Sequence, residues 1–554
     1  MPNTMLFGTI SLLYTFLASR PVGVYTIDIQ EPLKLPFENT IYKAACPDYK
    51  NYAMRQHAPY SSGPLELPFQ RPSKYCRTFE SPLVEKVIED MNQKLVDKDL
   101  ARIFENAFPN TLDTTVRWHV SGTEKGTEKK FKKSKKAADA DAWLGPQSFI
   151  VTGDINAEWL RDSTNQLAQY QLLAKKDKKI HNLILGAINT QAEYIIGSPY
   201  CNAFQPPPLS GLSPTYGGGE DEVHPAYEPS FVFECKYELD SLAAFLSLTN
   251  QFHNHTGSTE FLTNRWYLAL DTLLEVLTAQ EKPTFNEETG KYERNEYTFQ
   301  RRTNTGTETL NLGGVGNPLN GGTGLIRSAF RPSDDATILG FLIPANAMIS
   351  VELKRCAAML DKAGKKKLAS ILRERGQGIE AGVWEHGVVR HKKYGEVFAF
   401  EVDGFGSSIL MDDANLPSLL ALPLLGFIDS NNDVYKNTRK MILEKQGNPY
   451  YLTGSDFHGI GGPHIGLQHA WPMSVLVQAM TSEDSSEIQH CLAMVKNASL
   501  NGLIHESINV DMRRDYTRPW FAWANSVFAQ TILDLAQRKP QVLFGPDAEP
   551  YVLG

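Results

Sequence analysis

The sequence predicts a mainly helical, all-α protein with long loops between its helices. Apolar residues recur at helical spacing in several well-separated stretches of the chain. Segments rich in proline and glycine, at residues 205–230 and 304–324, interrupt these stretches and predict loop insertions. The sequence lacks strands that alternate with helices and a glycine-rich fingerprint at a strand end, which disfavours a doubly wound parallel sheet.

Four helical stretches stand out in chain order. The first begins at Leu160, where apolar residues fall seven and then three positions apart. The second follows Asp240, and the third runs from Ile349 to Arg375 with a break at Gly364. The last shows helical spacing at Trp520, Ala524, Val527, Phe528 and Leu535.

Length and composition describe a large folded protein. A chain of 554 residues can form one oversized domain or two to four ordinary ones. Hydrophobic residues make up 42% and aromatic residues 10% of the chain, which excludes wholesale disorder. The 63 acidic residues outnumber the 55 basic ones, and the net charge of −8 argues against nucleic acid as a partner.

The first 22 residues carry a targeting signal. Met5 to Ala18 is a largely apolar run, too short for a confident membrane span, and it ends in a weak small-residue cleavage context. We expect residues 1–22 to be a signal peptide, with a retained signal anchor as the alternative. Sequons at Asn254 and Asn497 fit a protein of the secretory pathway, either secreted, in the cell wall or in the Golgi or ER lumen.

Several irregular features surround the patterned region. Residues 23–74 are rich in proline and poor in periodicity, so we expect an irregular leader packed on the body. Lysines crowd residues 123–141 and predict a solvated loop, with a basic patch for an anionic partner as the less favoured reading. The six cysteines lack zinc-ligand spacing, so no metal site is expected, and Cys46 with Cys76 is the first candidate for a disulfide.

The segment Thr152–Gln166 is the most informative stretch for function. Glu158, Arg161 and Asp162 lie within about one turn of the predicted helix start. An arginine beside an aspartate offers a donor fork and an acceptor, which together suit the recognition of vicinal hydroxyls. The alternative is a helix start that is rich in acids because the helix dipole favours them there.

Other acidic patches lie beside aromatic residues or glycines, and each alone could be a helix start or a turn. Together they favour a polyhydroxylated ligand, because carboxylates accept hydroxyl protons and indole rings stack on sugar faces. Hydrolysis of a glycosidic bond needs two carboxyl groups, one a proton donor and the other a base or nucleophile. The residues themselves do not choose the pair. These patches contain Asp240, Arg331–Asp335, Glu401–Gly406, Met411–Asn415, Gly461–His464 and Ile504–Asn509.

Six of these motifs resemble glycoside hydrolase family 125, the metal-independent exo-α-1,6-mannosidases, in a fungal version. They occur in family order and extend over about residues 75 to 540, so we expect a catalytic domain at 75–545. The lysine-rich loop and the two segments rich in glycine and proline have no counterpart in shorter bacterial members. The motifs are Gly153–Ser163, Tyr237–Ser241, Phe330–Asp335, Met411–Asn415, His505–Ser507 and Thr517–Asn525.

The resemblance implies an (α/α)6 barrel, a double ring of helices with the site at one mouth. It also implies an inverting reaction without a cofactor, on terminal mannose of N-glycans or mannan-type oligosaccharides. Carried over by motif, Asp240 is the general acid and Glu506 the general base. Glu238 would face another way on a helix, so the motif selects Asp240. The expected mannose-binding residues are Arg161, Asp162, Asp334, Asp335 and His464, with Trp520 as a wall.

Two alternatives remain open at this point. Another (α/α)6 glycosidase, such as a glucoamylase-like α-glucosidase, would share the fold and the carboxylate pair. A non-catalytic mannoside-binding protein would keep the barrel without turnover, although both expected carboxylates are present. The predicted partner is a mannose-containing glycan, and no sequence feature predicts a stable protein partner.

Overall fold

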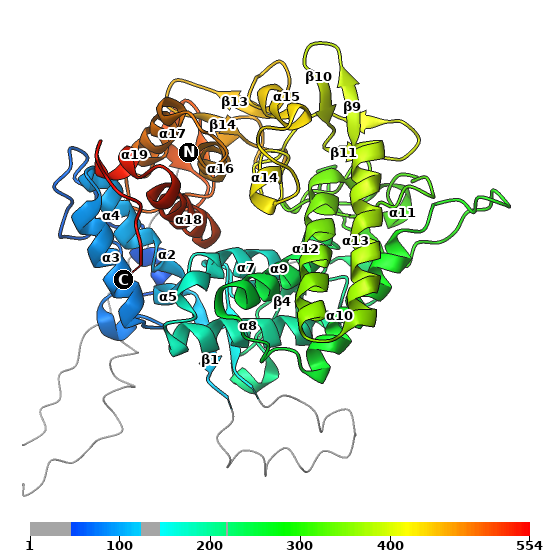
Figure 1. The fold of residues 1–554 in the computed structure, drawn as a ribbon, viewed down its shortest axis with the longest axis horizontal. Helices are drawn as coiled ribbons and strands as arrows, with labels where there is room; N and C mark the ends of the chain where they lie inside the picture. The colour runs from blue at the N-terminus through cyan, green and yellow to red at the C-terminus, as the bar shows by residue number, and fades with distance from the viewer. Residues whose placement is uncertain (1–45, 123–144, 218–219, 554) are drawn as a thin grey trace, which may run out of the picture. The chain divides into compact units, whose positions relative to one another are not determined.

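Helices carry most of the fold in the computed structural model, which describes residues 46–122, 145–217 and 220–553 (Figure 1). The elements belong to one unit, Pro47–Gly554. The 3-10 helices are η1 (Lys74–Cys76), η3 (Gln171–Leu173) and η4 (Pro208–Ser210). The α-helices are α2 (Tyr49–Tyr52), α3 (Pro82–Lys94), α4 (Lys98–Ala107), α5 (Asn110–Thr114), α7 (Leu160–Ala168), α8 (Lys178–Gly197), α9 (Leu239–Thr256), α10 (Asn264–Gln280), α11 (Asn311–Gly314), α12 (Ile343–Lys362), α13 (Lys366–Gly387), α14 (Leu422–Leu425), α15 (Asp433–Ile442), α16 (Pro472–Met480), α17 (Ser485–Ala498), α18 (Ala522–Arg538) and α19 (Pro540–Phe544).

The predicted mainly helical fold is confirmed, and short strands that the sequence did not predict accompany the helices. Most have only two or three residues, too few to show the alternation by which a strand is found in a sequence. They form small antiparallel sheets, of which the three-stranded ones have the orders β3-β4-β6, β12-β11-β8 and β15-β16-β17. The strands are β1 (Val116–Val120), β2 (Gln147–Ile150), β3 (Glu158–Trp159), β4 (Ala203–Phe204), β5 (Glu222–His224), β6 (Val232–Glu234), β7 (Thr298–Gln300), β8 (Phe341–Leu342), β9 (Val388–His391), β10 (Gly395–Phe398), β11 (Glu401–Val402), β12 (Ser408–Ile409), β13 (Tyr451–Thr453), β14 (His458–Ile460), β15 (His469–Ala470), β16 (Ile508–Asn509) and β17 (Met512–Tyr516).

Some helices are buried all round, and others bury one face. Most residues of α9 and of α12 are buried, as in a helix enclosed by other helices. In contrast, α13 buries mainly residues three or four apart, such as Leu372, Gly376 and Ile379. A side chain at Gly376 would meet the Ser350 carbonyl oxygen of α12 at 2.8 Å, so glycine permits this close packing. The predicted break at Gly364 separates these two helices and is confirmed.

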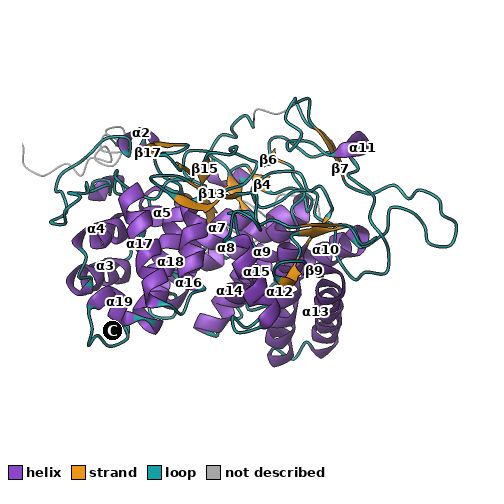
Figure 2. Ribbon diagram, turned by 90° about the horizontal axis from the view of Figure 1, so that it is seen from above, coloured by secondary structure: helices purple, strands orange, loops and turns teal. Residues whose placement is uncertain are grey.

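The enclosed helices pack against one another in a series. Helix α12 packs on α9, α9 on α7, α7 on α18, and α18 on α16. Each of these five helices follows a short strand in the chain. Strands and long loops gather over one end of the helices (Figure 2). A rigid helical body with loops over one end is a common scaffold for a binding site.

Residues 47–74 pack on this body through specific polar contacts. Arg71 forms ion pairs with Asp113 at 2.7 Å and with Glu85 at 2.6 Å. The Gln70 backbone N–H donates to Asn106 Oδ1 at 2.9 Å. These contacts fix an irregular segment, because its buried backbone groups find partners in α4 and the helices beside it.

The cysteines include a disulfide that the sequence did not predict. Cys201 and Cys235 are bonded across 34 positions of the chain, and Cys356 and Cys491 are free and buried. Cys46 and Cys76 are both disulfide-bonded cysteines, as expected.

Two further predictions concern segments that the structure does not describe. The predicted signal segment 1–22 lies outside the described residues, and so does most of the lysine-rich loop 123–141. Within the described residues, no helix has the length and apolar character of a membrane span.

Candidate active site

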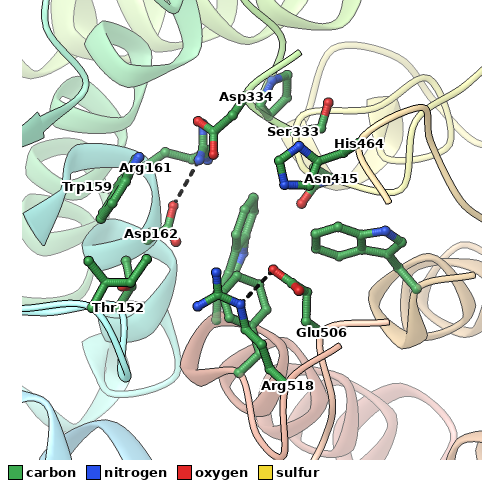
Figure 3. A pocket seen from close by; sticks show the side chains of 15 residues that line it. Thr152, Trp159, Arg161, Asp162, Ser333, Asp334, Asn415, His464, Glu506 and Arg518 are labelled. Atoms are coloured by element: carbon green, nitrogen blue, oxygen red, sulfur yellow. Dashed lines mark ion pairs between the residues drawn. The ribbon is translucent and has the colours of Figure 1, made fainter. Parts of the chain in front are cut away.

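A polar pocket lies where the segments before α7, α16 and α18 meet (Figure 3). Its volume is about 60 Å³, or about 430 Å³ when the open space at its mouth is included. Its lining combines carboxylates and arginines with aromatic rings, a mixture suited to a polyhydroxylated ligand. The lining residues are Thr152, Ile155, Trp159, Arg161, Asp162, Pro332, Ser333, Asp334, Asn415, His464, Trp471, Glu506, Arg518, Phe521 and Trp523.

Local folding brings Arg161 and Asp162 to the pocket. Strand β3 ends at Trp159, and α7 begins at the next residue, so both charged side chains lie in the first turn. Strand β3 pairs with β4, and β4 pairs with β6, which leads toward α9. This small sheet therefore places Glu238 and Asp240 beside the start of α7.

One wall of the site is a buried network around Arg161. Its Nη1 lies 2.6 Å from Glu238 Oε2 and 3.5 Å from Asp240 Oδ2. Its Nη2 lies 3.1 Å from Asp162 Oδ1. The single guanidinium therefore faces three carboxyl groups, too many for one positive charge to neutralise.

Burial raises the pKa values of the three carboxyl groups in this wall. It raises the pKa of Asp240 and of Asp162 to about 6 in each case, although the Arg161 charge opposes the rise. Burial also raises the pKa of Glu238 well above its usual range. Of the three carboxyl groups that face Arg161, Glu238 is therefore the one whose neutral form burial favours most.

Asp334 connects this network to the pocket. Asn202 Nδ2 donates to Glu238 Oε1 at 3.2 Å and to Asp334 Oδ1 at 3.4 Å. Burial acts to raise the pKa of Asp334, but the Lys236 and Arg161 charges and a hydrogen bond with Glu238 lower it overall. Glu238 and Asp334 thus form a carboxyl pair that shares a proton.

The opposite wall holds a single carboxylate, Glu506. Arg518 Nε lies 3.0 Å from Glu506 Oε1, and Thr517 Oγ1 donates to Glu506 Oε2 at 2.6 Å. Arg518 also pairs with Asp154, which belongs to the loop before β3. Figure 3 shows Asp334 and Glu506 on opposite sides of the pocket. Two carboxyl groups thus face one cavity, one in a proton-sharing pair and the other held by an arginine.

Aromatic rings supply the apolar part of the lining. Trp159, Trp471, Phe521 and Trp523 come from the segments that enter α7, α16 and α18. The Arg161 guanidinium lies 5.1 Å from the Trp523 ring centroid, a cation–π contact that helps to fix this ring. Such ring faces can pack against the C–H face of a sugar.

Five of the eight predicted site residues line the pocket, and three do not. The lining residues are Arg161, Asp162, Asp334, His464 and Glu506. Asp240 is fully buried, with its carboxylate behind Arg161, so the structure does not bring this predicted acid to the pocket wall.

Asp335 and Trp520 do not line the pocket either. Asp335 is buried, and Ser333 Oγ lies 3.2 Å from its carboxylate but donates over a shorter 2.6 Å to Asp413. Trp520 lies in the extended segment before α18 and packs on Gly153, where a Cβ would lie 2.9 Å from the indole. The predicted aromatic wall is instead Trp523, three residues later.

Sequence reasoning missed Arg518, Asn202 and the pairing of Glu238 with Asp334. Arg518 follows an exposed strand and looks like a surface residue in the sequence. Asp334 has a detectable backbone signal in the structure, since its φ of 68° is rare for a residue other than glycine and such strain clusters at functional sites. Within the described ranges, no group of three or more His, Cys, Asp and Glu side chains is arranged to hold a metal ion.

A family model confirms the resemblance. The model for the metal-independent alpha-mannosidases of glycoside hydrolase family 125 matches residues 97–533, which is most of the chain. The chain belongs to this family. It is therefore a glycoside hydrolase of the α-mannosidase type.

Two relatives are informative. The Meiotically up-regulated gene 157 protein of Schizosaccharomyces pombe is 53% identical over 500 residues, which cover 90% of this chain and 94% of that protein. A Streptococcus pneumoniae metal-independent alpha mannosidase, solved in a non-productive complex with alpha-1,6-mannobiose, is 29% identical with a TM-score of 0.70. That match covers 82% of this chain and 99% of the bacterial one.

Proposed function

We propose that this protein is an exo-acting α-1,6-mannosidase that removes terminal mannose from N-glycans or mannan-type oligosaccharides. The observation that carries the proposal is a small pocket with carboxyl groups on two opposite walls and aromatic rings between them. The α-1,6-mannobiose bound by the bacterial relative supports the linkage. A pocket of about 430 Å³ suits one terminal sugar better than the middle of a chain.

Asp334 and Glu506 are the catalytic pair in this proposal. Glu506 acts as the general base that activates a water molecule, as the sequence suggested. Asp334 replaces Asp240 as the general acid, because the acid must reach the glycosidic oxygen and Asp240 is enclosed behind Arg161. An inverting mechanism needs room for a water between base and sugar.

Glu238 would supply the proton that Asp334 delivers. The charges around Asp334 favour its ionised form, whereas burial keeps the proton on Glu238. Asn202 and Arg161 hold the two carboxyl groups together. When the glycosidic oxygen gains negative charge on bond cleavage, Glu238 gives its proton to Asp334 as Asp334 protonates that oxygen, so the proton that leaves Glu238 ends on the departing group.

The architecture that fits this role is the (α/α)6 barrel. The enclosed helices α7, α9, α12, α16 and α18 would form the inner ring together with α14, which packs on α12. One-sided helices such as α10 and α13 would belong to the outer ring. The loops over one end would form the mouth (Figure 2).

The decisive experiment is incubation with α-1,2-, α-1,3- and α-1,6-mannobiose side by side, with maltose and isomaltose as glucosidase controls. We expect release of mannose from the α-1,6 disaccharide alone. Hydrolysis of isomaltose would identify a glucosidase, and binding without hydrolysis of any disaccharide would identify a mannoside-binding protein.

The stereochemistry is tested separately. Proton NMR of the first minutes of hydrolysis should show β-mannose as the first product, because an inverting enzyme adds water to the face opposite the leaving group. Initial α-mannose would instead require a covalent intermediate and would reject the roles given to Asp334 and Glu506.

We also propose that the protein folds in the secretory pathway. The Cys201–Cys235 disulfide fits an oxidising compartment, and both sequon asparagines, Asn254 and Asn497, are exposed. Enzymatic release of N-glycans converts each glycosylated asparagine to aspartate. Mass spectrometry of the protein from its own cells should find this conversion at both positions, and two unmodified asparagines would contradict the proposal.

A further inference from the structure

Arg327 is a buried guanidinium without an acidic partner. Its side chain is only 5% exposed. Among the described residues it forms no ion pair, and its one side-chain hydrogen bond runs from Nη2 to Thr284 Oγ1 at 3.4 Å. By contrast, the equally buried Arg161 and Arg331 lie 2.6 Å from glutamate oxygens. An isolated buried charge is costly, so it calls for a counterion.

Space for a counterion exists beside Arg327. A small pocket of about 50 Å³, open toward the exposed side chains of Lys282 and Glu296, touches Arg327 and Thr284, and a space of about 10 Å³ also borders the arginine. A water molecule needs about 10–15 Å³ by this measure. The larger cavity therefore has room for a monatomic anion with water, and the smaller one for a single water.

The acidic residues in the wall of the larger cavity are engaged elsewhere. Glu293 accepts a hydrogen bond from Asn286 at 2.8 Å. Glu296 accepts from Tyr200 at 3.3 Å and lies 3.8 Å from Lys282. The wall also contains the basic side chains of Lys282 and Arg294, so its formal charge is one positive unit when Arg327 is included.

A second unsatisfied group lies close by. The Tyr237 hydroxyl is buried, and within the described part of the chain it has no hydrogen-bond partner. Tyr237 is tied to this segment through its backbone, since its carbonyl accepts from the N–H of Ala329, two residues after Arg327. Burial lowers the pKa of Arg327 to about 10, as expected for a cation without a counter-charge.

We propose that Arg327 binds a halide-sized monovalent anion, chloride under ordinary conditions, in this cavity. The anion would neutralise the charge of the guanidinium and accept hydrogen bonds from its free N–H groups. It would also support the segment that carries Glu238. The Leu239 N–H donates to the hydroxyl of Ser328, the residue after Arg327, and the Tyr237 carbonyl accepts from the Ala329 and Phe330 N–H groups.

The test uses bromide as a chloride substitute with a strong anomalous signal. Crystals of the wild-type protein soaked in sodium bromide should show an anomalous peak against the Arg327 guanidinium. In solution, Tm should rise by about 1–3 °C in chloride or bromide relative to gluconate at equal ionic strength, with saturation.

The matched variants are Arg327→Met and Arg390→Met. Arg327→Met should lose the halide-specific rise, and Arg390→Met should keep it, because Arg390 is an exposed arginine on β9. The bromide map decides the proposal even if Arg327→Met fails to fold. Absence of a peak at Arg327 overturns it, as does a halide effect of equal size in wild type and Arg327→Met.

Discussion

The two walls of the pocket hold their carboxyl groups in opposite ways. On the Arg161 side, Asp162, Glu238 and Asp240 compete for one guanidinium in a buried network. On the other side, Glu506 lies 3.0 Å from Arg518, which also pairs with Asp154, and accepts from a hydroxyl donor at 2.6 Å. Burial raises the pKa of each carboxyl group in the Arg161 wall, against the pull of the arginine charge.

This contrast teaches how one pocket can contain an acid and a base at the same pH. The position of a carboxyl group in the sequence does not decide its role, since Asp240 and Asp334 both belong to acidic motifs. Its folded surroundings do decide it, since burial raises the pKa of Glu238 and Asp334 beside it can pass that proton on. Replacing these groups one at a time tests the contrast between the walls.

Removing either member of the proposed pair should have the largest effect. Asp334→Asn and Glu506→Gln should each lower kcat on α-1,6-mannobiose by about 10²–10⁴-fold, the usual contribution of general acid–base catalysis. Asp240→Asn should cost less than either, because its side chain is enclosed. If Asp240→Asn proves the most damaging of the three while Tm is unchanged, the acid is Asp240 after all.

Glu238→Gln should change the pH profile more than the fold. Its raised pKa keeps a proton in the pair as pH rises, so the active form survives toward neutral pH. Without that proton, Asp334 is left among positive charges and loses its own proton at lower pH. The alkaline limb of kcat/KM should move down by about one pH unit or more. An unchanged limb would show that Glu238 stores no proton for catalysis.

Thr517 should affect the base wall moderately. Thr517→Val removes the donor that holds Glu506 Oε2, and a hydrogen bond to a charged group contributes enough to predict about a 10-fold loss in kcat. KM should change little, since Thr517 does not line the pocket. Thr517→Ser keeps the hydroxyl and should restore most of the rate. A rise in KM with kcat unchanged would show that Thr517 acts in substrate binding and does not position Glu506.

Glu158 is a buried glutamate that does not line the pocket, so it tests how burial changes a carboxyl pKa apart from catalysis. Burial raises the pKa of this glutamate to about 8, and its Oε1 has no partner within the described residues. The folded state therefore keeps a proton that the unfolded state loses above about pH 4.5, so stability should fall as pH rises from about 4.5 to 8. Glu158→Gln should raise Tm at pH 8 but not at pH 4.5.

Glu288→Gln is the control for this measurement. Glu288 is an exposed glutamate, so its replacement should leave the pH dependence of Tm as in the wild type. Equal pH slopes in wild type and Glu158→Gln would contradict the buried neutral acid.

Much of the helical fold could be predicted from the sequence, because enclosed helices have long apolar patterns. Arg161 and Asp162 could also be placed, since their charges stand at the entry to a patterned segment, whereas Glu506 was placed only by the family resemblance. Trp520 could not be told from Trp523, because the wall depends on α18 beginning at Ala522. Periodicity does not fix a helix boundary to within two residues.

The acid was harder to predict for a different reason. Asp240 and Asp334 belong to equally acidic motifs, and only the pairing of β3, β4 and β6 encloses one of them. Arg518 gave no signal, because its partners Glu506 and Asp154 meet only after segments far apart in the sequence have packed together.

The Cys201–Cys235 disulfide joins the two ends of the segment that contains β4, the long insertion and β6. Its neighbours in sequence are Asn202, which holds Glu238 and Asp334 together, and Lys236, whose charge acts on Asp334. The disulfide thus closes the insertion into a loop at the point where it leaves the body of the protein. A protease that cut its exposed loop would leave two fragments still joined, with the proton-sharing pair undisturbed. Evolution could lengthen or reshape this loop to meet new glycans without disturbing the chemistry beneath it.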